Sequence, residues 1–210
     1  MFANRTEAGK QLAEALDHLG GEEVVVLGVP RGGVEVAAVV AAERGWSLDI
    51  VVPRKVGAPF NSELGLGAIA PGVRVIDEGM LRGLGISEEY LEGEIRKQED
   101  EIRRRTEAYR RGKKPVGLSG KTVVLVDDGI ATGGTAVAAV RWARAQGTSR
   151  VVLAVPVAPK EAVAKLSKES DEVVCLATPE PFFAVGQWYG DFPQIDDERV
   201  IELLDLAAQD

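Results

Sequence analysis

Two adjacent carboxylates, Asp127 and Asp128, stand between an apolar run and a turn rich in glycine and threonine. The stretch from Val123 to Thr135 reads V-V-L-V-D-D-G-I-A-T-G-G-T, and an alanine/valine run with helical spacing follows it. This order predicts a buried strand, a tight loop and a helix N-terminus. Free N–H groups at such a helix start suit a phosphate, and neighbouring carboxylates suit sugar hydroxyls or Mg²⁺. The stretch therefore predicts a site for a phosphorylated sugar with a metal.

Composition limits the classes of function. A chain of 210 residues with 45% hydrophobic residues fits one globular domain. Its formal net charge of −8 argues against a nucleic-acid partner. One cysteine, Cys175, and one histidine, His18, are too few for a zinc site or a disulfide within one chain. The N-terminus lacks a signal-peptide core and no apolar run approaches membrane-spanning length, so we expect a cytoplasmic protein without a membrane partner.

Strands and helices are expected to alternate along the chain. Four valine-rich runs, at 24–27, 123–126, 151–155 and 173–176, predict buried strands, and helical segments lie between several of them. This pattern indicates an α/β fold with a parallel sheet covered on both faces. Ligands in such folds bind beyond the carboxyl ends of the strands. A further run at 48–52, stopped by Pro53, also predicts a strand. The segments 28–33, 54–61, 127–135 and 156–160 all follow predicted strands, so we expect four loops to gather at one edge.

A long charged segment, 87–111, is expected to form a helix that Ser87 caps. Opposite charges stand four residues apart in it, for example Glu99 with Arg103 and Glu101 with Arg105. We interpret this segment as a solvated surface helix. The segment 64–76 alternates around Pro71-Gly72 and predicts a hairpin.

The motif V-L-V-D-D-G-I-A-T-G-G-T resembles the phosphoribosyl-pyrophosphate (PRPP) loop of the type I phosphoribosyltransferases. Pro30-Arg31-Gly32-Gly33 is similar to the pyrophosphate loop of that family, and Arg54-Lys55 with the 64–76 hairpin stands where its flexible loop lies. The resemblance covers about residues 22–197. It implies the type I phosphoribosyltransferase fold in one domain, 1–210, with a core at about 22–177, a small C-terminal hood at about 178–197 and an inserted charged helix at about 87–111.

The resemblance also implies an activity, the Mg²⁺-dependent transfer of ribose 5-phosphate from PRPP to a nitrogen nucleophile with release of pyrophosphate. Asp127 and Asp128 would hold the ribose hydroxyls near the developing positive charge and reach the metal indirectly, through PRPP or water. Arg31 would bind the pyrophosphate, and Lys55 would close over it. The remaining residues implied in PRPP binding are Gly32, Gly33, Arg54, Ala131, Thr132, Gly133, Gly134 and Thr135.

The acceptor stays open at the sequence level. Members that use 6-oxopurines typically have an aspartate at the variable loop position, where this chain has Ala131, so the resemblance disfavours hypoxanthine and guanine. The 178–197 segment is rich in aromatic residues and resembles the hood, in which an aromatic side chain stacks on the base. Phe183 is the best positional candidate for base binding, with Phe182, Trp188 and Tyr189 as alternatives. The stretch K-V-G-A-P-F-N-S-E-L-G-L-G-A-I most resembles bacterial phosphoribosyltransferases without a settled substrate.

Two other functions remain open. A non-catalytic PRPP- or nucleotide-binding regulatory module would use the same loop, and a third possibility is cleavage of PRPP without transfer to a base. The acidic charge and the lack of a helix-turn-helix extension favour the enzyme. The expected partners are PRPP and a small nitrogen-containing acceptor, and the family resemblance allows a homodimer.

Overall fold

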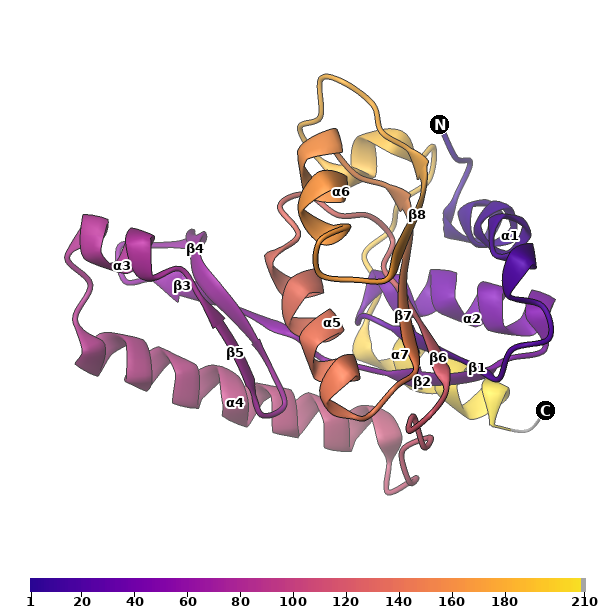
Figure 1. The fold of residues 1–210 in the computed structure, drawn as a ribbon, viewed down its shortest axis with the longest axis horizontal. Coiled ribbons are helices and arrows are strands. Elements are labelled where there is room, and N and C mark those ends of the chain that lie inside the picture. Colours follow the sequence, from indigo (N-terminus) through magenta and orange to yellow (C-terminus); the bar gives the residue numbers. More distant parts are fainter. Residues whose placement is uncertain (209–210) are drawn as a thin grey trace.

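Five parallel strands form the central sheet of the computed structural model, which describes residues 1–208. In spatial order these strands are β2 (Ser47–Ile50), β1 (Val24–Gly28), β6 (Thr122–Val126), β7 (Arg150–Val157) and β8 (Glu172–Ala177). Nearly all residues of β1, β6 and β7 are buried. Near-continuous apolar strands need cover on both faces, and helices lie on both sides of the sheet (Figure 1). The predicted α/β fold with a parallel sheet flanked by helices is therefore confirmed.

Alternate residues of the central strands pack against two different helical layers. On one face, α1 (Arg5–Ala15) and α2 (Gly32–Arg44) cover side chains such as Val26 and Val124. On the other face, α5 (Gly134–Ala145) and α6 (Lys160–Leu166) cover side chains such as Val25 and Val123. A short 3₁₀ turn, Asp17–Leu19, follows α1. The two-residue period of a strand thus divides the core into two halves.

A second, antiparallel sheet projects from the first (Figure 1). It contains β3 (Arg54–Ala58), β4 (Asn61–Ala70) and β5 (Val73–Ile76), and α3 (Glu78–Leu84) follows it. The predicted hairpin is confirmed as β4 and β5. The prediction that 54–61 is an irregular loop is wrong, because residues 54–58 pair with β4. This segment leaves the end of β2 and extends into the second sheet, so it does not remain with the other loops at the edge of the first.

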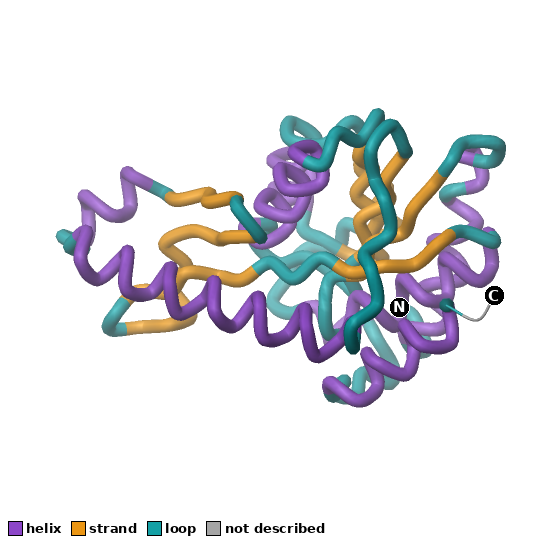
Figure 2. The backbone as a smooth tube through the Cα atoms, turned by 90° about the horizontal axis from the view of Figure 1, so that it is seen from below, coloured by secondary structure: helices purple, strands orange, loops and turns teal. Residues whose placement is uncertain are grey.

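The long helix α4 (Glu88–Arg110) joins the two sheets, as Figure 2 shows from below. Ser87 caps it as predicted, since its Oγ accepts a hydrogen bond from the Tyr90 N–H at 3.2 Å. The interpretation as a solvated helix is wrong for one face, where Ile95, Ile102 and Tyr109 are buried against the second sheet and α7 (Asp197–Ala207). The charges between these three residues obscure their helical spacing in the sequence.

The charge pairs on α4 also differ in part from the prediction. Glu101 does pair with Arg105, at 2.6 Å. Glu99 instead contacts Arg74 of β5, and Arg103 contacts Asp100. The predicted pair of Glu99 with Arg103 is therefore not formed. Glu99 contacts the second sheet instead, and Arg103 contacts a nearer residue of the same helix. No helix within residues 1–208 is both long and apolar enough to cross a membrane.

The segment 178–197, which we call the hood segment, is fastened by the first residues of the chain. Phe2 forms a parallel bridge with Tyr189, and hydrogen bonds of 2.8 Å run from the Phe2 N–H to the Trp188 carbonyl and from the Gly190 N–H to the Phe2 carbonyl. The hood segment contains one 3₁₀ turn, Val185–Trp188. Residues far apart in the sequence thus meet beside the carboxyl ends of the strands.

Candidate active site

The 127–135 loop leaves the carboxyl end of β6 and leads into α5. Gly133, with a positive φ of 76°, is the N-cap of α5 and offers no side-chain hydrogen bond. The first turn of α5 contains no acidic residue, and Ala131 and Thr132 are exposed. The N–H groups at this helix start are therefore open to an anion.

Gly32 and Gly33, at the start of α2, lie directly against the carboxylate pair. A Cβ atom added to Gly32 would stand 1.9 Å from Oδ2 of Asp128, and one added to Gly33 would stand 2.9 Å from Oδ1 of Asp127. Only glycine permits such a close approach. The structure thus brings together the 28–33 and 127–135 loops, which the sequence places about a hundred residues apart.

Burial governs the charge of the pair. Burial and the adjacent Asp128 carboxylate raise the pKa of Asp127 well above its usual range. Burial also raises the pKa of Asp128, although the Arg5 guanidinium opposes this effect. Neighbouring carboxyl groups that interact this strongly titrate as a pair. The site therefore resists carrying two negative charges at once.

Arg5 is a site residue that sequence reasoning missed. Its Nε donates a hydrogen bond to Oδ2 of Asp128 at 2.8 Å, although Arg5 is in α1. Its side chain is only 5% exposed. A signal was present, because Asn4 caps the helix and places a cation at its first position, where the helix dipole favours an acidic residue. A cation in that position needs a carboxylate from elsewhere.

Arg31 lies at the meeting point of three elements. It precedes α2, and its Nη1 is 3.7 Å from Oδ1 of Asp197, the first residue of α7. The same oxygen accepts a hydrogen bond from the Tyr109 hydroxyl of α4 at 2.7 Å. Burial and this hydrogen bond raise the pKa of Tyr109 to about 12. The hydroxyl thus stays a donor, and Asp197 keeps Arg31 within reach of the site.

Arg54 and Lys55 point to opposite sides of β3, as successive strand residues do. Arg54 donates a hydrogen bond to Oε1 of Gln98 on α4 at 2.9 Å. Lys55 pairs with Glu63 across the hairpin at 3.0 Å. Within residues 1–208, neither forms an ion pair or hydrogen bond with the predicted site residues of the other loops. Closure over the leaving group therefore stays a prediction for both.

The aromatic residues of the hood segment divide into packed and exposed ones. Phe182 stacks on Trp188, with ring centroids 6.4 Å apart. Tyr189 is buried and its hydroxyl donates to the Asp128 carbonyl at 2.5 Å. Phe183 is 77% exposed. Of the four predicted candidates, Phe183 is the one whose ring is left free to meet a planar ligand.

The hood segment rests on the loop of the carboxylate pair. A Cβ atom on Gly129 would stand 2.4 Å from Cγ1 of Val185. The hood segment also lines a cavity of about 360 Å³, through its residues 192–195, together with Arg5, Arg31 and Gly32. Two arginines and a helix start therefore line one hollow at the edge of the sheet.

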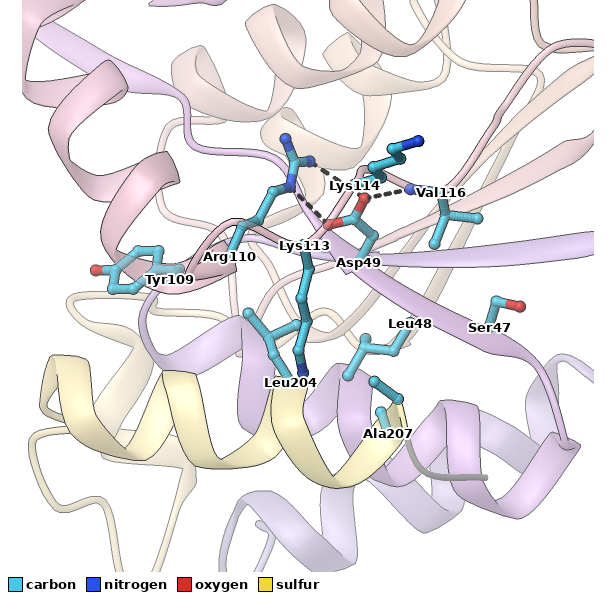
Figure 3. Close-up of a pocket in the computed structure, with 11 residues that line it drawn as sticks. Ser47, Leu48, Asp49, Tyr109, Arg110, Lys113, Lys114, Val116, Leu204 and Ala207 are labelled. Atoms are coloured by element: carbon cyan, nitrogen blue, oxygen red, sulfur yellow. Dashed lines mark hydrogen bonds and ion pairs between the residues drawn. The ribbon is translucent and has the colours of Figure 1, made fainter.

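A different cavity, of about 250 Å³, lies near the start of β2 (Figure 3). In this cavity Asp49 accepts hydrogen bonds from Arg110 and from the Val116 N–H. These bonds hold the segment between α4 and β6 in place. None of the predicted site residues lines this cavity. Its position at the amino end of a strand separates it from the candidate active site.

The chain is similar in sequence and in structure to known proteins. The family model described as a phosphoribosyl transferase domain matches residues 4–187. Proteins from two Mycobacterium tuberculosis strains, CDC 1551 / Oshkosh and H37Rv, whose names provisionally call them phosphoribosyl transferases, are 50% identical to this chain over 211 residues. The match covers 100% of this chain and 48% of theirs, so the chain spans about half the length of these curated relatives. The crystal structure of TT1426 from Thermus thermophilus is similar at 48% identity and a TM-score of 0.82, covering 97% of both chains.

Proposed function

Since the chain belongs to the phosphoribosyltransferase family, we propose that it transfers ribose 5-phosphate from PRPP to a nitrogen nucleophile and releases pyrophosphate. One observation carries the proposal, namely the close packing of the 28–33 loop on the Asp127–Asp128 pair. That packing sets a carboxylate pair, which suits a sugar, directly beside Arg31 and the start of α2, which suit a diphosphate. These are the two halves of the donor.

The chemistry needs opposite charges at the two ends of the bond that breaks. Positive charge develops on the sugar ring as the bond to pyrophosphate lengthens, and preorganised groups of opposite charge stabilise such a transition state. Asp128 would face the sugar, while Arg31 and the N–H groups of Gly32 and Gly33 would face the leaving group. The open start of α5 would hold the 5-phosphate, with the hydroxyls of Thr132 and Thr135.

A magnesium ion fits this arrangement only as a companion of the donor. Within residues 1–208 no three His, Cys, Asp or Glu side chains group as a metal site, and Asp128 is already bonded to Arg5. Mg²⁺ keeps several waters and often binds through substrate phosphates. Asp127 and Asp128 would therefore reach it through water or PRPP oxygens, and the bound ion would offset negative charge on the pyrophosphate.

The acceptor is proposed as a nucleobase or another small nitrogen nucleophile. Ala131 leaves the variable loop position without a carboxylate, which disfavours a 6-oxopurine. Phe183, exposed on the hood segment, is the proposed stacking partner for a planar base.

Calorimetric titration with PRPP and Mg²⁺ tests the donor half. Asp128→Asn and Thr132→Ala should weaken PRPP binding about ten- to a hundredfold, as expected when one hydrogen bond to a charged group is lost. Thr148→Ala, just beyond the other end of α5, is the matched control and should bind like the wild type. Failure of the wild-type protein to bind PRPP would contradict the proposal.

A screen of nucleobases with PRPP, followed by pyrophosphate release, tests the transfer. Release that depends on a particular base supports the proposed reaction. Release without any acceptor identifies hydrolysis instead, and binding without release identifies a regulatory module. Phe183→Ala should raise the KM for the accepted base more than it lowers kcat, because a stacking contact acts mainly on binding.

A further inference from the structure

Part of the cavity beside Arg31 is lined by a residue from outside the predicted loops. Along with Arg31 and Gly32, it is lined by Arg5, which comes from the N-terminal helix rather than from any predicted loop. Helix α2 begins at Gly32 with no side-chain cap, so its first N–H groups also face this region. The cavity thus combines two guanidinium groups with a helix N-terminus, a set of donors that favours an anion.

Three sides of Arg5 are occupied by the protein. Nε donates to Asp128, Nη1 donates to the Pro193 carbonyl at 2.8 Å, and the guanidinium lies 3.8 Å from the centroid of the Phe192 ring. Glu35 adds a weaker contact, with Oε2 3.7 Å from Nη1. These contacts fix the plane of the guanidinium, so its position does not depend on a ligand.

The fourth side of Arg5 is free. Within residues 1–208, Nη2 has no hydrogen-bond partner, although the residue is only 5% exposed. Nη2 itself is accessible to solvent. A rigid guanidinium that lines a cavity and has one donor group without a protein partner is suited to a ligand.

We propose that Arg5 is a second binding residue for the diphosphate of the donor, acting with Arg31 across the cavity that both residues line. This inference rests on the proposed function. Arginine binds phosphate through paired N–H donors, and the two arginines would approach a diphosphate from different elements, α1 and the start of α2. Because Arg5 also holds Asp128, one side chain would connect the leaving-group half of the site to the sugar half.

Binding of inorganic pyrophosphate with Mg²⁺ isolates this role, because pyrophosphate has no sugar for Asp128 to hold. Arg5→Gln keeps an amide that can hydrogen-bond to Asp128 but removes the charge, and it should weaken pyrophosphate binding at least tenfold. Arg5→Lys keeps the charge with fewer donors and should recover part of that loss. The matched control is Arg44→Gln, which removes an ion pair with Asp17 and a stacking contact with Trp46 away from the site; it should bind pyrophosphate within twofold of the wild type.

The same measurement in an Asp128→Asn background separates contact from positioning. If Arg5 contacts the diphosphate, Arg5→Gln still weakens pyrophosphate binding at least tenfold when Asp128 is neutral. A loss that disappears in this background, or an Arg5→Gln protein that is folded and binds pyrophosphate like the wild type, overturns the inference. If the wild type binds PRPP in either case, the proposed function is unaffected. A wild type that binds neither ligand overturns both.

Discussion

At the scale of single residues, the candidate site depends on two glycines, because neither has a side chain. Gly32 and Gly33 lie so close to Asp128 and Asp127 that a methyl group would overlap their oxygens. The backbone at the start of α2 therefore covers one side of the carboxyl groups, and the Arg5 side chain covers another side of Asp128. This accounts both for their raised pKa values and for the position of the helix start beside them.

Gly32→Ala tests this close approach. Alanine is favoured over glycine within a helix by about 0.5–1 kcal/mol, but here the added Cβ would stand 1.9 Å from Asp128. We expect a net loss of about 1–3 kcal/mol in the free energy of unfolding, as for other overpacked sites, together with weaker PRPP binding. Gly93→Ala in α4, where a Cβ meets open space, should instead stabilise the protein. Urea denaturation of both variants checks the opposite signs, and equal effects would contradict the argument.

Asp127→Asn tests the buried charge. The folded protein holds the Asp127 proton to a higher pH than the unfolded chain does, so the free energy of unfolding falls as the pH rises above the ordinary aspartate range. Asparagine has no such proton to lose. The Tm of the variant should therefore exceed that of the wild type by an amount that grows from about pH 4 upward. A Tm difference that does not change with pH would contradict this expectation.

At the scale of elements, α4 is the connection between the two sheets. One face carries Ile95, Ile102 and Tyr109 into the core, and the hydroxyl of Tyr109 reaches Asp197 at the start of α7. The other face carries ion pairs, among which Glu101 is bonded to both Arg104 and Arg105. The helix therefore helps to position Arg31 through Tyr109 and Asp197, while its outer face remains solvated.

Glu101→Gln measures the contribution of that ion-pair cluster. Hydrogen bonds from Arg104 and Arg105 lower the pKa of Glu101 to about 2. The stabilisation is thus present above the usual glutamate pKa and is lost as the pH falls from about 4.5 toward 2. Because the pair is near the surface, we expect a cost of at most about 1 kcal/mol at about pH 7, declining to nothing near pH 2. Asp100→Asn, with one exposed partner, Arg103, is the control and should cost less at about pH 7.

The sequence predicts the central sheet well and the second sheet poorly, for a physical reason. Buried parallel strands such as 123–126 are apolar on both faces, and that pattern is unambiguous. The segment 54–58 contains Arg54, Lys55 and Gly57, and it becomes a strand only because β4 pairs with it. The carboxylate loop can be predicted from consecutive residues. The position of Arg5 in the site cannot be predicted in this way, because its partner Asp128 is 123 residues away in the sequence.

At the scale of the whole molecule, the N-terminal residues and the hood segment close the candidate site together. Phe2 is 5% exposed and packs on Tyr189, with ring centroids 5.5 Å apart, while Arg5 holds the carbonyl of Pro193. The hood segment therefore depends on the first residues of the chain as well as on the loop beneath it.

Phe2→Ala should loosen the hood segment before it affects the central sheet. Truncating a buried phenylalanine costs about 3–5 kcal/mol, and here the lost contacts are concentrated on residues 188–192. Hydrogen exchange should accelerate in that segment far more than in β6 or β7. Phe60→Ala, at a position that is 65% exposed, should leave exchange unchanged. Uniform acceleration across the molecule would show that the N-terminus supports the whole fold instead.

The joining of Phe2 and Arg5 to the hood segment has a consequence for biosynthesis. Asp128 leaves the ribosome about 65 residues before Pro193 does, which at about 5–20 residues per second is a delay of about 3–13 s. Throughout that interval the nascent chain has its carboxylate pair and Arg5 but not the Pro193 carbonyl that helps to hold the guanidinium. A growing polypeptide would thus complete its candidate site only after the hood segment has been translated, when these distant parts of the sequence can first meet.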